Sequence, residues 1–280
     1  MKTVIEVIQV TTAYFQKSGV ESARLNIEHL LAHILGKKRM QLYLEFDRPL
    51  SDAELNPLRD LVKRRALGEP LQHLLGTVEF CGRIFGCDGR ALVPRPETEQ
   101  LCELTIADFR QRERTPARIL DVGTGSGVIA LTLAAAWPAA GVEAVDLSPA
   151  ALALARENAT RLGLQERLKL VEGDLFSGSA GEFDLIVANL PYIDSAVIPA
   201  LTREVQRDPL LALDGGKRGM QVFERFVPDA RKHLRGLLAL EIGHDQTEEL
   251  RDLLSTHNYQ DIRVVSDYQS RHRFVFASYG

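Results

Sequence analysis

The chain has 280 residues, with 34 basic and 38 acidic side chains and a formal net charge of −4. Hydrophobic residues make up 45% of it and charged residues 26%, which is typical of a globular protein and excludes disordered and collagen-like classes. The slightly acidic balance argues against a protein that holds nucleic acid by a pervasive basic surface, although it is compatible with a local basic patch. The length allows one large or two ordinary domains.

Several sequence features bear on location and metal binding. No stretch approaches the roughly 20 uninterrupted apolar residues that a membrane span needs, and Glu6 comes too early for a secretory signal. We therefore expect a cytoplasmic protein without a membrane partner. The three cysteines have no CxxC spacing and are interpreted as reduced structural thiols. His29 and His33 have the spacing of one helix face, but no third ligand accompanies them, so no metal site is predicted.

Residues 1–75 have helical periodicity and are interpreted as a small helical bundle. Gly36 is a typical stop signal after the second helix. Ser51 followed by Glu54 has the spacing of a capping box before the third helix. The predicted helices cover residues 4–15, residues 25–35 and residues 51 to about 68.

The composition changes after this bundle. Residues 76–93 combine glycines with apolar strand formers and are predicted to be a hairpin linker. The run Pro94 to Glu99 opens a helix, because proline and acids suit a first turn. Apolar runs then alternate with helical segments, so residues 94–280 are predicted to form an α/β domain with a mainly parallel, seven-stranded, doubly wound sheet. The last two strands are expected to close it as an antiparallel pair. The expected strands contain residues 119–122, 142–145, 168–171, 185–188, 237–240, 262–265 and 274–277.

The sharpest motif follows the first strand of this sheet. It reads Asp121-Val122-Gly123-Thr124-Gly125-Ser126-Gly127. Three alternating glycines let the backbone turn tightly into a helix and approach a ligand closely. Because the spacing is G-x-G-x-G rather than G-x-G-x-x-G, a nucleoside site is favoured over a pyrophosphate cradle. The alternative is a tight turn without a ligand.

Carboxylates follow the next two strands. Asp146 comes 21 residues after Gly125, where an acid can accept hydrogen bonds from both hydroxyls of a ribose. Asp174 can accept from an adenine amino group, and Leu175 or Phe176 can face the ring. In this order the motifs resemble the S-adenosylmethionine site of class I (Rossmann-like) methyltransferases. A helix N-cap or a surface acid is the alternative for Asp146, and core packing is the alternative for the two apolar residues.

The fourth strand ends in Asn189-Leu190-Pro191-Tyr192, at the edge where an open parallel sheet binds ligands. A planar amide or aromatic amine nitrogen is a poor nucleophile because its lone pair is delocalised. Hydrogen bonds from its N–H groups to the Asn189 side-chain oxygen and a main-chain carbonyl would orient it and favour pyramidalisation. Pro191 would stiffen the loop and Tyr192 would stack on the planar group. The alternative is an Asn-initiated turn with a packed tyrosine.

This tetrapeptide resembles the (N/D)-P-P-(Y/F) motif of methyltransferases that act on such nitrogens, with Leu190 in place of the first proline. It also resembles the N-L-P-Y of the rRNA adenine dimethyltransferases. Flanking segments favour one family: residues 69–76, 79–80 and 93–99 resemble the linker signature of the PrmC/HemK family, the N5-glutamine methyltransferases of peptide chain release factors. The resemblance covers nearly the whole chain and continues through Glu204-Val205, Asp208-Pro209, Ala212-Leu213, Gly215-Gly216, Gly219, Leu240-Glu241-Ile242-Gly243 and Gln246.

The resemblance implies methyl transfer from S-adenosyl-L-methionine to the glutamine amide nitrogen in a release factor's Gly-Gly-Gln motif. Residues 189–192 would bind this glutamine, with Asn189, Pro191 and Tyr192 as the catalytic residues. Leu175 stands where the family often has tryptophan, which implies a weaker adenine contact. Arg95 and Glu97 either shape the site mouth or start the helix. The implied cofactor-binding residues are Asp121, Gly123, Thr124, Gly125, Ser126, Gly127, Asp146, Asp174, Leu175 and Asn189.

The expected partner is a release factor, with no stable nucleic-acid partner. Residues 1–90 carry 13 basic and 11 acidic side chains, against 21 and 27 in the remainder. This division suggests that the helical domain docks a protein substrate while the acidic part performs the transfer. Two alternatives stay open: an adenine-N6 methyltransferase acting on RNA or DNA, which the acidic part disfavours, and a non-catalytic cofactor-binding scaffold.

Overall fold

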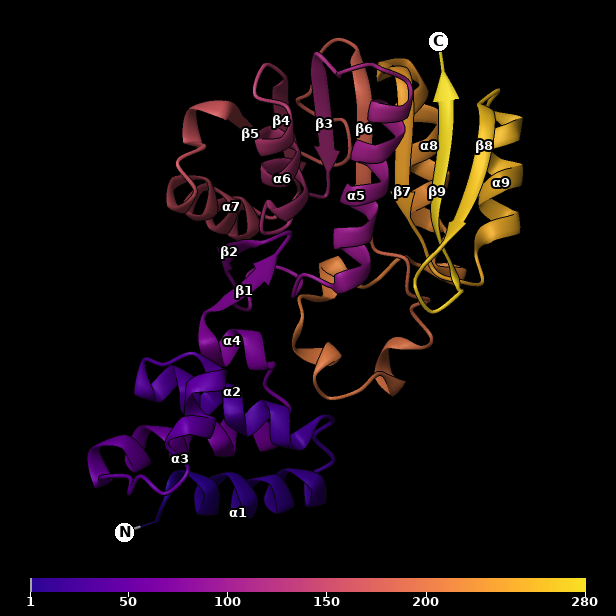
Figure 1. Cartoon of the computed structure of the whole chain (residues 1–280). Coiled ribbons are helices and arrows are strands. Elements are labelled where there is room, and N and C mark those ends of the chain that lie inside the picture. The colour runs from indigo at the N-terminus through magenta and orange to yellow at the C-terminus, as the bar shows by residue number, and fades with distance from the viewer. Residues whose placement is uncertain (1) are drawn as a thin grey trace. The chain divides into compact units, whose positions relative to one another are not determined.

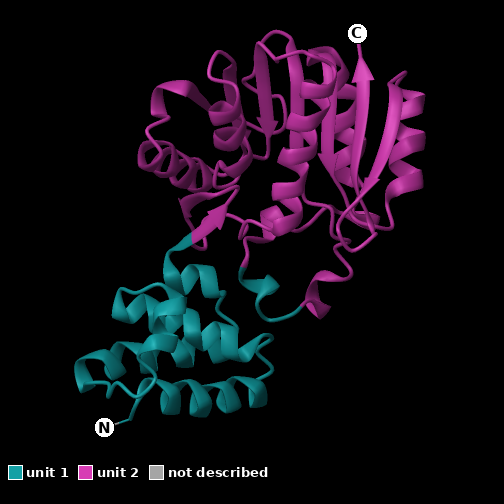
Figure 2. Ribbon diagram, in the orientation of Figure 1, with its two compact units in different colours: residues 1–77, 202–207 teal, residues 78–201, 208–280 magenta. Residues whose placement is uncertain are grey.

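The computed structural model describes residues 2–280. The described residues up to Thr77, together with residues 202–207, form one compact unit, and residues 78–201 with 208–280 form another. We call them unit 1 and unit 2, and Figure 2 colours them separately. No helix of the described residues is long and apolar enough to cross a membrane.

Unit 1 is helical, as its periodicity predicts. Ser51 and Glu54 form the expected reciprocal capping box, and Gly36 ends the second helix with a φ of +61°. Thr3 and Glu6 form a further capping box at the first helix. The three predicted helices are confirmed, and a short fourth helix was not predicted. The elements are α1 (Val4–Lys17), α2 (Ala23–Leu35), the 3-10 helix η1 (Arg39–Leu44), α3 (Asp52–Ala66) and α4 (Leu71–Leu75).

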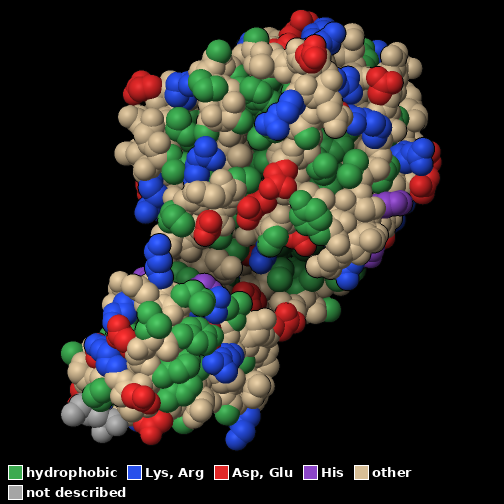
Figure 3. Space-filling model, viewed as in Figure 1, with side chains coloured by type: hydrophobic (Ala, Val, Ile, Leu, Met, Phe, Trp, Pro, Cys, Tyr) green, Lys and Arg blue, Asp and Glu red, His purple; other side chains and the backbone are tan. Residues whose placement is uncertain are grey.

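One apolar core stabilises unit 1. Phe15 and Ile27 are completely buried within it, and each such side chain contributes about 1.5–3 kcal/mol of transfer free energy. Apolar side chains also gather on the face of this unit that Figure 3 displays. Among its exposed large apolar residues are Tyr14, Met40 and Leu44, which is 85% exposed.

The segment 202–207 is tied to unit 1 by a buried arginine. The Arg65 guanidinium donates to Asn26 Oδ1 at 2.6 Å and to the Glu69 carbonyl at 2.9 Å. It also donates to Glu204 Oε2 at 2.6 Å. The charge of this buried side chain is therefore compensated by one carboxylate and two neutral acceptors.

The predicted hairpin precedes the first long helix of unit 2. Its turn residues Cys81 and Gly82 both have positive φ, +47° and +71°, as a tight turn with the twist of a hairpin requires. Helix α5 then begins at Pro96, with Arg95 as N-cap and acids in its first turn. The elements are β1 (Thr77–Phe80), β2 (Arg83–Gly86) and α5 (Pro96–Gln111).

Unit 2 is built on the predicted seven-stranded, mainly parallel sheet (Figure 1). The strand order is β5-β4-β3-β6-β7-β9-β8. Strand β9 is antiparallel to both β7 and β8, so the predicted antiparallel closure is confirmed. The strands are β3 (Arg118–Val122), β4 (Gly141–Asp146), β5 (Leu168–Glu172), β6 (Phe183–Asn189), β7 (Leu234–Glu241), β8 (Gln260–Ser266) and β9 (His272–Tyr279).

Helices cover both faces of this sheet (Figure 1). On one face, Leu101 and Leu131 belong to a core shared with α5 and α6. On the other face, Phe223 and Leu250 belong to a core shared with α8 and α9. The further helices are α6 (Val128–Ala136), α7 (Pro149–Arg161), α8 (Gln221–His233) and α9 (Thr247–Thr256).

The order of the strands changes direction beside β3. The chain proceeds outward from β3 to β4 and β5 and then returns to β6 on the other side, which opens a crevice at the carboxyl ends of the strands. The parallel register aligns Val122 with Val145 and with Ala188, and it aligns Asn189 with Glu241. The residues that follow these strand ends therefore meet at one edge of the sheet.

Candidate active site

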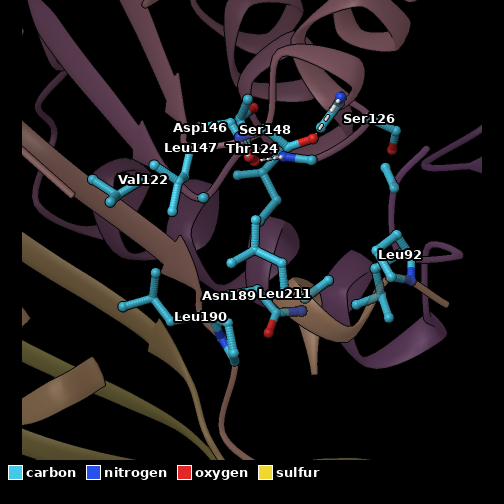
Figure 4. A pocket seen from close by; sticks show the side chains of 18 of the residues that line it. Leu92, Val122, Thr124, Ser126, Asp146, Leu147, Ser148, Asn189, Leu190 and Leu211 are labelled. Atoms are coloured by element: carbon cyan, nitrogen blue, oxygen red, sulfur yellow. Dashed lines mark hydrogen bonds between the residues drawn. The ribbon is translucent and has the colours of Figure 1, made fainter. Parts of the chain in front are cut away.

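A cavity opens at this carboxyl edge (Figure 4). The linker before α5 and the loops after β3, β4, β5 and β6 line it. Most of the predicted site residues meet here. They are Gly123, Thr124, Gly125, Ser126, Asp146, Asp174, Leu175, Asn189, Leu190 and Pro191.

The glycine loop between β3 and α6 is tied closely to the sheet. Gly123, Gly125 and Gly127 have φ values between +55° and +82°, which glycine adopts without strain. The N–H groups of Gly123 and Thr124 donate to the Val145 carbonyl at 2.8 and 3.0 Å. That of Gly125 donates to the carboxylate at the end of β4 at 2.8 Å. Because these three donors already have acceptors, they do not form a phosphate cradle, which agrees with the nucleoside interpretation.

Asp146 lies half-buried at the end of β4 and lines the cavity. Its two oxygens accept from the N–H groups of Gly125 and Ser148, each at 2.8 Å. A carboxylate offers about four lone-pair positions, so acceptor capacity remains for the hydroxyls of a ligand. Burial raises the pKa of Asp146 while these backbone bonds oppose the rise. The N-cap of α7 is Ser148, two residues after Asp146, so Asp146 is not the cap of this helix.

The loop after β5 contributes Asp174 and Leu175. Leu175 lines the cavity with a φ of +53°, a strained value for a leucine. Phe176 is buried instead and stacks on His233, with 5.2 Å between ring centroids. Of the two apolar residues whose role was open, Leu175 thus faces the cavity and Phe176 belongs to the core. Asp174 forms an ion pair with Arg225 of α8, a cavity residue that sequence reasoning missed.

The tetrapeptide at the carboxyl end of β6 divides between the cavity and the adjoining core. Asn189, Leu190 and Pro191 line the cavity, whereas Tyr192 is not among the lining residues. Leu190 is only 3% exposed. A Cβ built on Gly123 would lie 3.2 Å from Leu190 Cδ2, so this leucine packs directly against the glycine loop. The residue that replaces the first proline of the family motif therefore fills the space between the two motifs.

A hydrogen-bond network connects the tetrapeptide to a buried carboxyl group. Asn189 Nδ2 donates to Thr98 Oγ1 at 3.0 Å, and the Thr98 hydroxyl donates to Glu241 Oε2 at 2.7 Å. The Tyr192 hydroxyl donates to Glu241 Oε1 at 3.3 Å. Burial raises the pKa of Glu241 to about 7 and raises that of Tyr192 above its ordinary range. Glu241 belongs to a motif that carried the family resemblance, but no role was predicted for it.

Arg95 combines the two roles that the sequence left as alternatives. It is the N-cap of α5 and it lines the cavity. Its guanidinium donates to Asp208 Oδ2 at 2.6 Å, while Asp208 Oδ1 accepts from the Val93 N–H at 3.0 Å. The pair therefore joins the linker to the loop beyond the tetrapeptide. Glu97 stays in the first turn of α5 and is not a lining residue.

Two further predicted cofactor residues, Asp121 and Gly127, do not line the cavity. Asp121 is completely buried, and its Oδ2 accepts from the Thr124 hydroxyl at 2.7 Å and from the Ala130 N–H at 3.1 Å. Burial raises its pKa to about 7. Gly127 is the N-cap residue of α6. Both residues contribute to the conformation of the glycine loop without lining the cavity. No signal in the sequence identified Leu92, Leu147 and Leu211, which also line the cavity (Figure 4).

Similarity to known proteins extends over both units. Residues 6–76 match the PrmC N-terminal domain family, and residues 102–206 match the methyltransferase small domain family. A release factor glutamine methyltransferase of Geobacter sulfurreducens is 42% identical, with 98% of this chain and 95% of the relative covered. One of Chlorobaculum tepidum is 40% identical, with 97% and 95% covered.

The solved structures show the fold. The Thermus thermophilus 16S rRNA N2 G1207 methyltransferase RsmC, in complex with AdoMet and guanosine, has a TM-score of 0.51 and 18% identity, covering 73% of this chain and 50% of that one. At this identity the likeness concerns the methyltransferase fold alone. The sequence relatives are far more similar and match almost end to end. The chain therefore belongs to the release factor glutamine methyltransferase family.

Proposed function

We propose that this chain transfers a methyl group from S-adenosylmethionine to the side-chain amide nitrogen of the glutamine in the Gly-Gly-Gln motif of a peptide chain release factor. One observation carries the proposal. The Asn189-Leu190-Pro191 segment lines the same cavity as the glycine loop and Asp146, in a chain that matches curated release factor glutamine methyltransferases over nearly its full length. Such an enzyme would work in the cytoplasm, where release factors meet ribosomes.

The end of the cavity beneath the glycine loop suits the nucleoside part of the cofactor. Asp146 retains acceptor capacity for two ribose hydroxyls. Asp174 and Leu175 would contact the adenine, and Gly123 to Ser126 would lie against the cofactor without intervening bulk. The bound cofactor supplies a sulfonium that makes its methyl group electrophilic. The chain therefore has to provide approach geometry and proton acceptors rather than a strong base.

The tetrapeptide end suits a planar amide. Asn189 would accept a hydrogen bond from the glutamine N–H, and a main-chain carbonyl of the tetrapeptide would accept the other. Two acceptors in fixed positions orient the nitrogen lone pair away from the amide plane and toward the methyl donor. Leu190 packs against the glycine loop, so it would hold the amide-binding end of the cavity at a fixed position relative to the nucleoside-binding end.

Unit 1 would dock the protein substrate. It exposes large apolar side chains such as Met40 and Leu44, and exposed apolar patches are typical of protein interaction surfaces. Its matched family is the PrmC N-terminal domain. The excess of basic over acidic side chains in residues 1–90 would add attraction to an acidic partner surface.

The direct test is to incubate the chain with isotope-labelled S-adenosylmethionine and an unmodified release factor, and to map the label by peptide mass spectrometry. We expect one methyl group on the peptide that contains Gly-Gly-Gln. The matched control is a release factor whose motif glutamine is replaced by alanine, which should accept none. Label in RNA or DNA instead would favour the adenine-N6 alternative. Cofactor binding without S-adenosylhomocysteine formation would favour the scaffold alternative.

A further inference from the structure

We infer that Glu241 is a positioning residue: through Thr98, its carboxylate fixes the direction of a hydrogen-bond chain that leaves the Asn189 amide oxygen free to accept from the methyl-accepting nitrogen. The inference rests on the proposed function, since it concerns the same acceptor end of the cavity. It assigns a role to a residue that lies one step behind the cavity wall.

The chain of hydrogen bonds is continuous from the cavity to the core. Asn189 and Thr98 line the cavity, whereas Glu241 does not and is 1% exposed. The contacts are 3.0 Å from Asn189 Nδ2 to Thr98 Oγ1 and 2.7 Å from Thr98 Oγ1 to Glu241 Oε2. Both lie within the normal range for hydrogen bonds.

The direction of this chain follows from the donors available. An ionised carboxylate only accepts, so the single hydroxyl hydrogen of Thr98 is committed to Glu241. The Thr98 oxygen can then only accept, and the Asn189 group that meets it is the NH₂ group. The Asn189 carbonyl oxygen is consequently turned away from Thr98. A donor in place of the carboxylate would permit the reverse direction, in which Thr98 donates to the Asn189 oxygen and the NH₂ group faces the substrate.

A second branch ties the far end of the tetrapeptide to the same carboxylate. The Tyr192 hydroxyl donates to Glu241 Oε1 at 3.3 Å. Asn189 and Glu241 are also register partners on the adjacent strands β6 and β7. One buried carboxylate therefore contacts both the last tetrapeptide residue and, through Thr98, the first.

The surroundings of Glu241 make its charge state responsive to pH. Arg273 of β9 favours the ionised form, whereas Glu97 of α5 and burial favour the neutral form. The hydroxyls of Thr98 and Tyr192 also favour ionisation. Burial is the largest influence and raises the pKa of Glu241 to about 7. Below that pH the carboxyl carries a hydrogen of its own, and the chain can reverse.

The test compares Glu241→Gln, Thr98→Val and Thr98→Ser, with Glu166→Gln as the matched surface control. Glu166 is exposed at the amino end of β5. Turnover of an unmodified release factor and cofactor affinity by calorimetry are measured for each. We expect Glu241→Gln and Thr98→Val to lower kcat by about tenfold to a hundredfold, as small misorientations do, with cofactor Kd unchanged within about threefold. Thr98→Ser keeps the hydroxyl and should retain kcat.

A pH profile distinguishes positioning from mere stabilisation. Wild-type kcat should fall about tenfold from pH 8 to pH 6 as a group of pKa near 7 is protonated, and Glu241→Gln should lack this fall. An unchanged acid limb in Glu241→Gln, or a wild-type kcat in Thr98→Val, would overturn the inference. Equal losses of kcat and cofactor affinity would overturn it as well. Failure of the proposed function is distinguishable, because the wild-type chain itself would then not methylate the glutamine.

Discussion

Each end of the cavity is backed by a buried carboxyl group, but the two groups are held in different ways. At the nucleoside end, Asp121 accepts from Thr124 and Ala130, which lie three and nine residues away along the chain. At the acceptor end, Glu241 accepts from Thr98 and Tyr192, 143 and 49 residues away. The first arrangement is local to one loop, and the second requires α5, the loop after β6 and β7 to come together.

Under the proposed function, this difference leads us to expect separate roles for the two ends of the cavity. The contacts of Asp121 involve only Thr124 of the glycine loop and Ala130 at the start of α6, so they depend on few other parts of the chain. The acceptor end depends on α5, on the end of β6 with the loop after it, and on β7, so its hydrogen-bonding groups are placed by elements far apart in the chain. We therefore expect damage at the acceptor end to reduce turnover and damage at the nucleoside end to reduce cofactor affinity.

The largest expected effect comes from Asn189→Ala. Removing a preorganised hydrogen-bonding group at the reacting nitrogen should lower kcat by about 10²- to 10³-fold. The cofactor Kd should stay within about threefold of wild type, because the proposed function places Asn189 against the methyl-accepting nitrogen, and Asp146 and the glycine loop, which would hold the nucleoside, are unchanged. Single-turnover kinetics and calorimetric titration measure the two quantities. If affinity fell as far as turnover, the two ends would not be functionally separate.

Asp146→Ala tests the opposite end. A hydrogen bond to a charged group contributes about 1.5–3 kcal/mol, so the cofactor Kd should rise about tenfold to a hundredfold. At saturating cofactor, kcat should recover most of its wild-type value. Asp252→Ala on α9, an exposed position, serves as the matched control. A persistent loss of kcat at saturation would show that Asp146 also acts on the transfer step.

Asp121→Asn tests, through the pH dependence of the free energy of unfolding, whether the carboxyl group behind the glycine loop is buried. Burial raises the pKa of Asp121 from 3.8 to about 7, so the native state holds a proton that the unfolded state releases. The contribution of Asp121 to the free energy of unfolding must then decrease as pH rises from about 4 to about 7. Between pH 5 and pH 8 this group should contribute a decrease of about 3 kcal/mol that the asparagine variant lacks. Urea unfolding at the two pH values measures it, and parallel curves for both proteins would contradict the buried-carboxyl interpretation.

Arg225→Ala should have the smallest effect. Arg225 forms an ion pair with Asp174, and both side chains are about half exposed. Exposed pairs contribute about 0–1 kcal/mol, so the cofactor Kd should change by less than about fivefold, with Lys232→Ala on the same helix as a control. A larger loss of affinity in titrations would mean that Arg225 itself contacts the ligand.

The fold was largely predictable because its signals are local. The capping box at Ser51 and Glu54, the left-handed stop at Gly36 and the alternation of strands with helices all depend on neighbouring residues. The glycine loop and Asp146 were equally recognisable, since a strand end fixes both. The segment 202–207 was not predicted to join the helical unit, because the Arg65–Glu204 pair spans 139 residues.

The sequence by itself determined the fold class, the family and the position of the ligand edge, since short motifs and periodicity encode them. Only the tertiary structure decided which side chains line the cavity and which support it from behind. It left Tyr192, Asp121 and Glu241 outside the lining set, with the two carboxyl groups fully buried, and placed Arg225 and Leu211 within it. The physical reason is that strand register and helix packing, rather than chain neighbours, bring Asn189, Thr98 and Glu241 within hydrogen-bond distance.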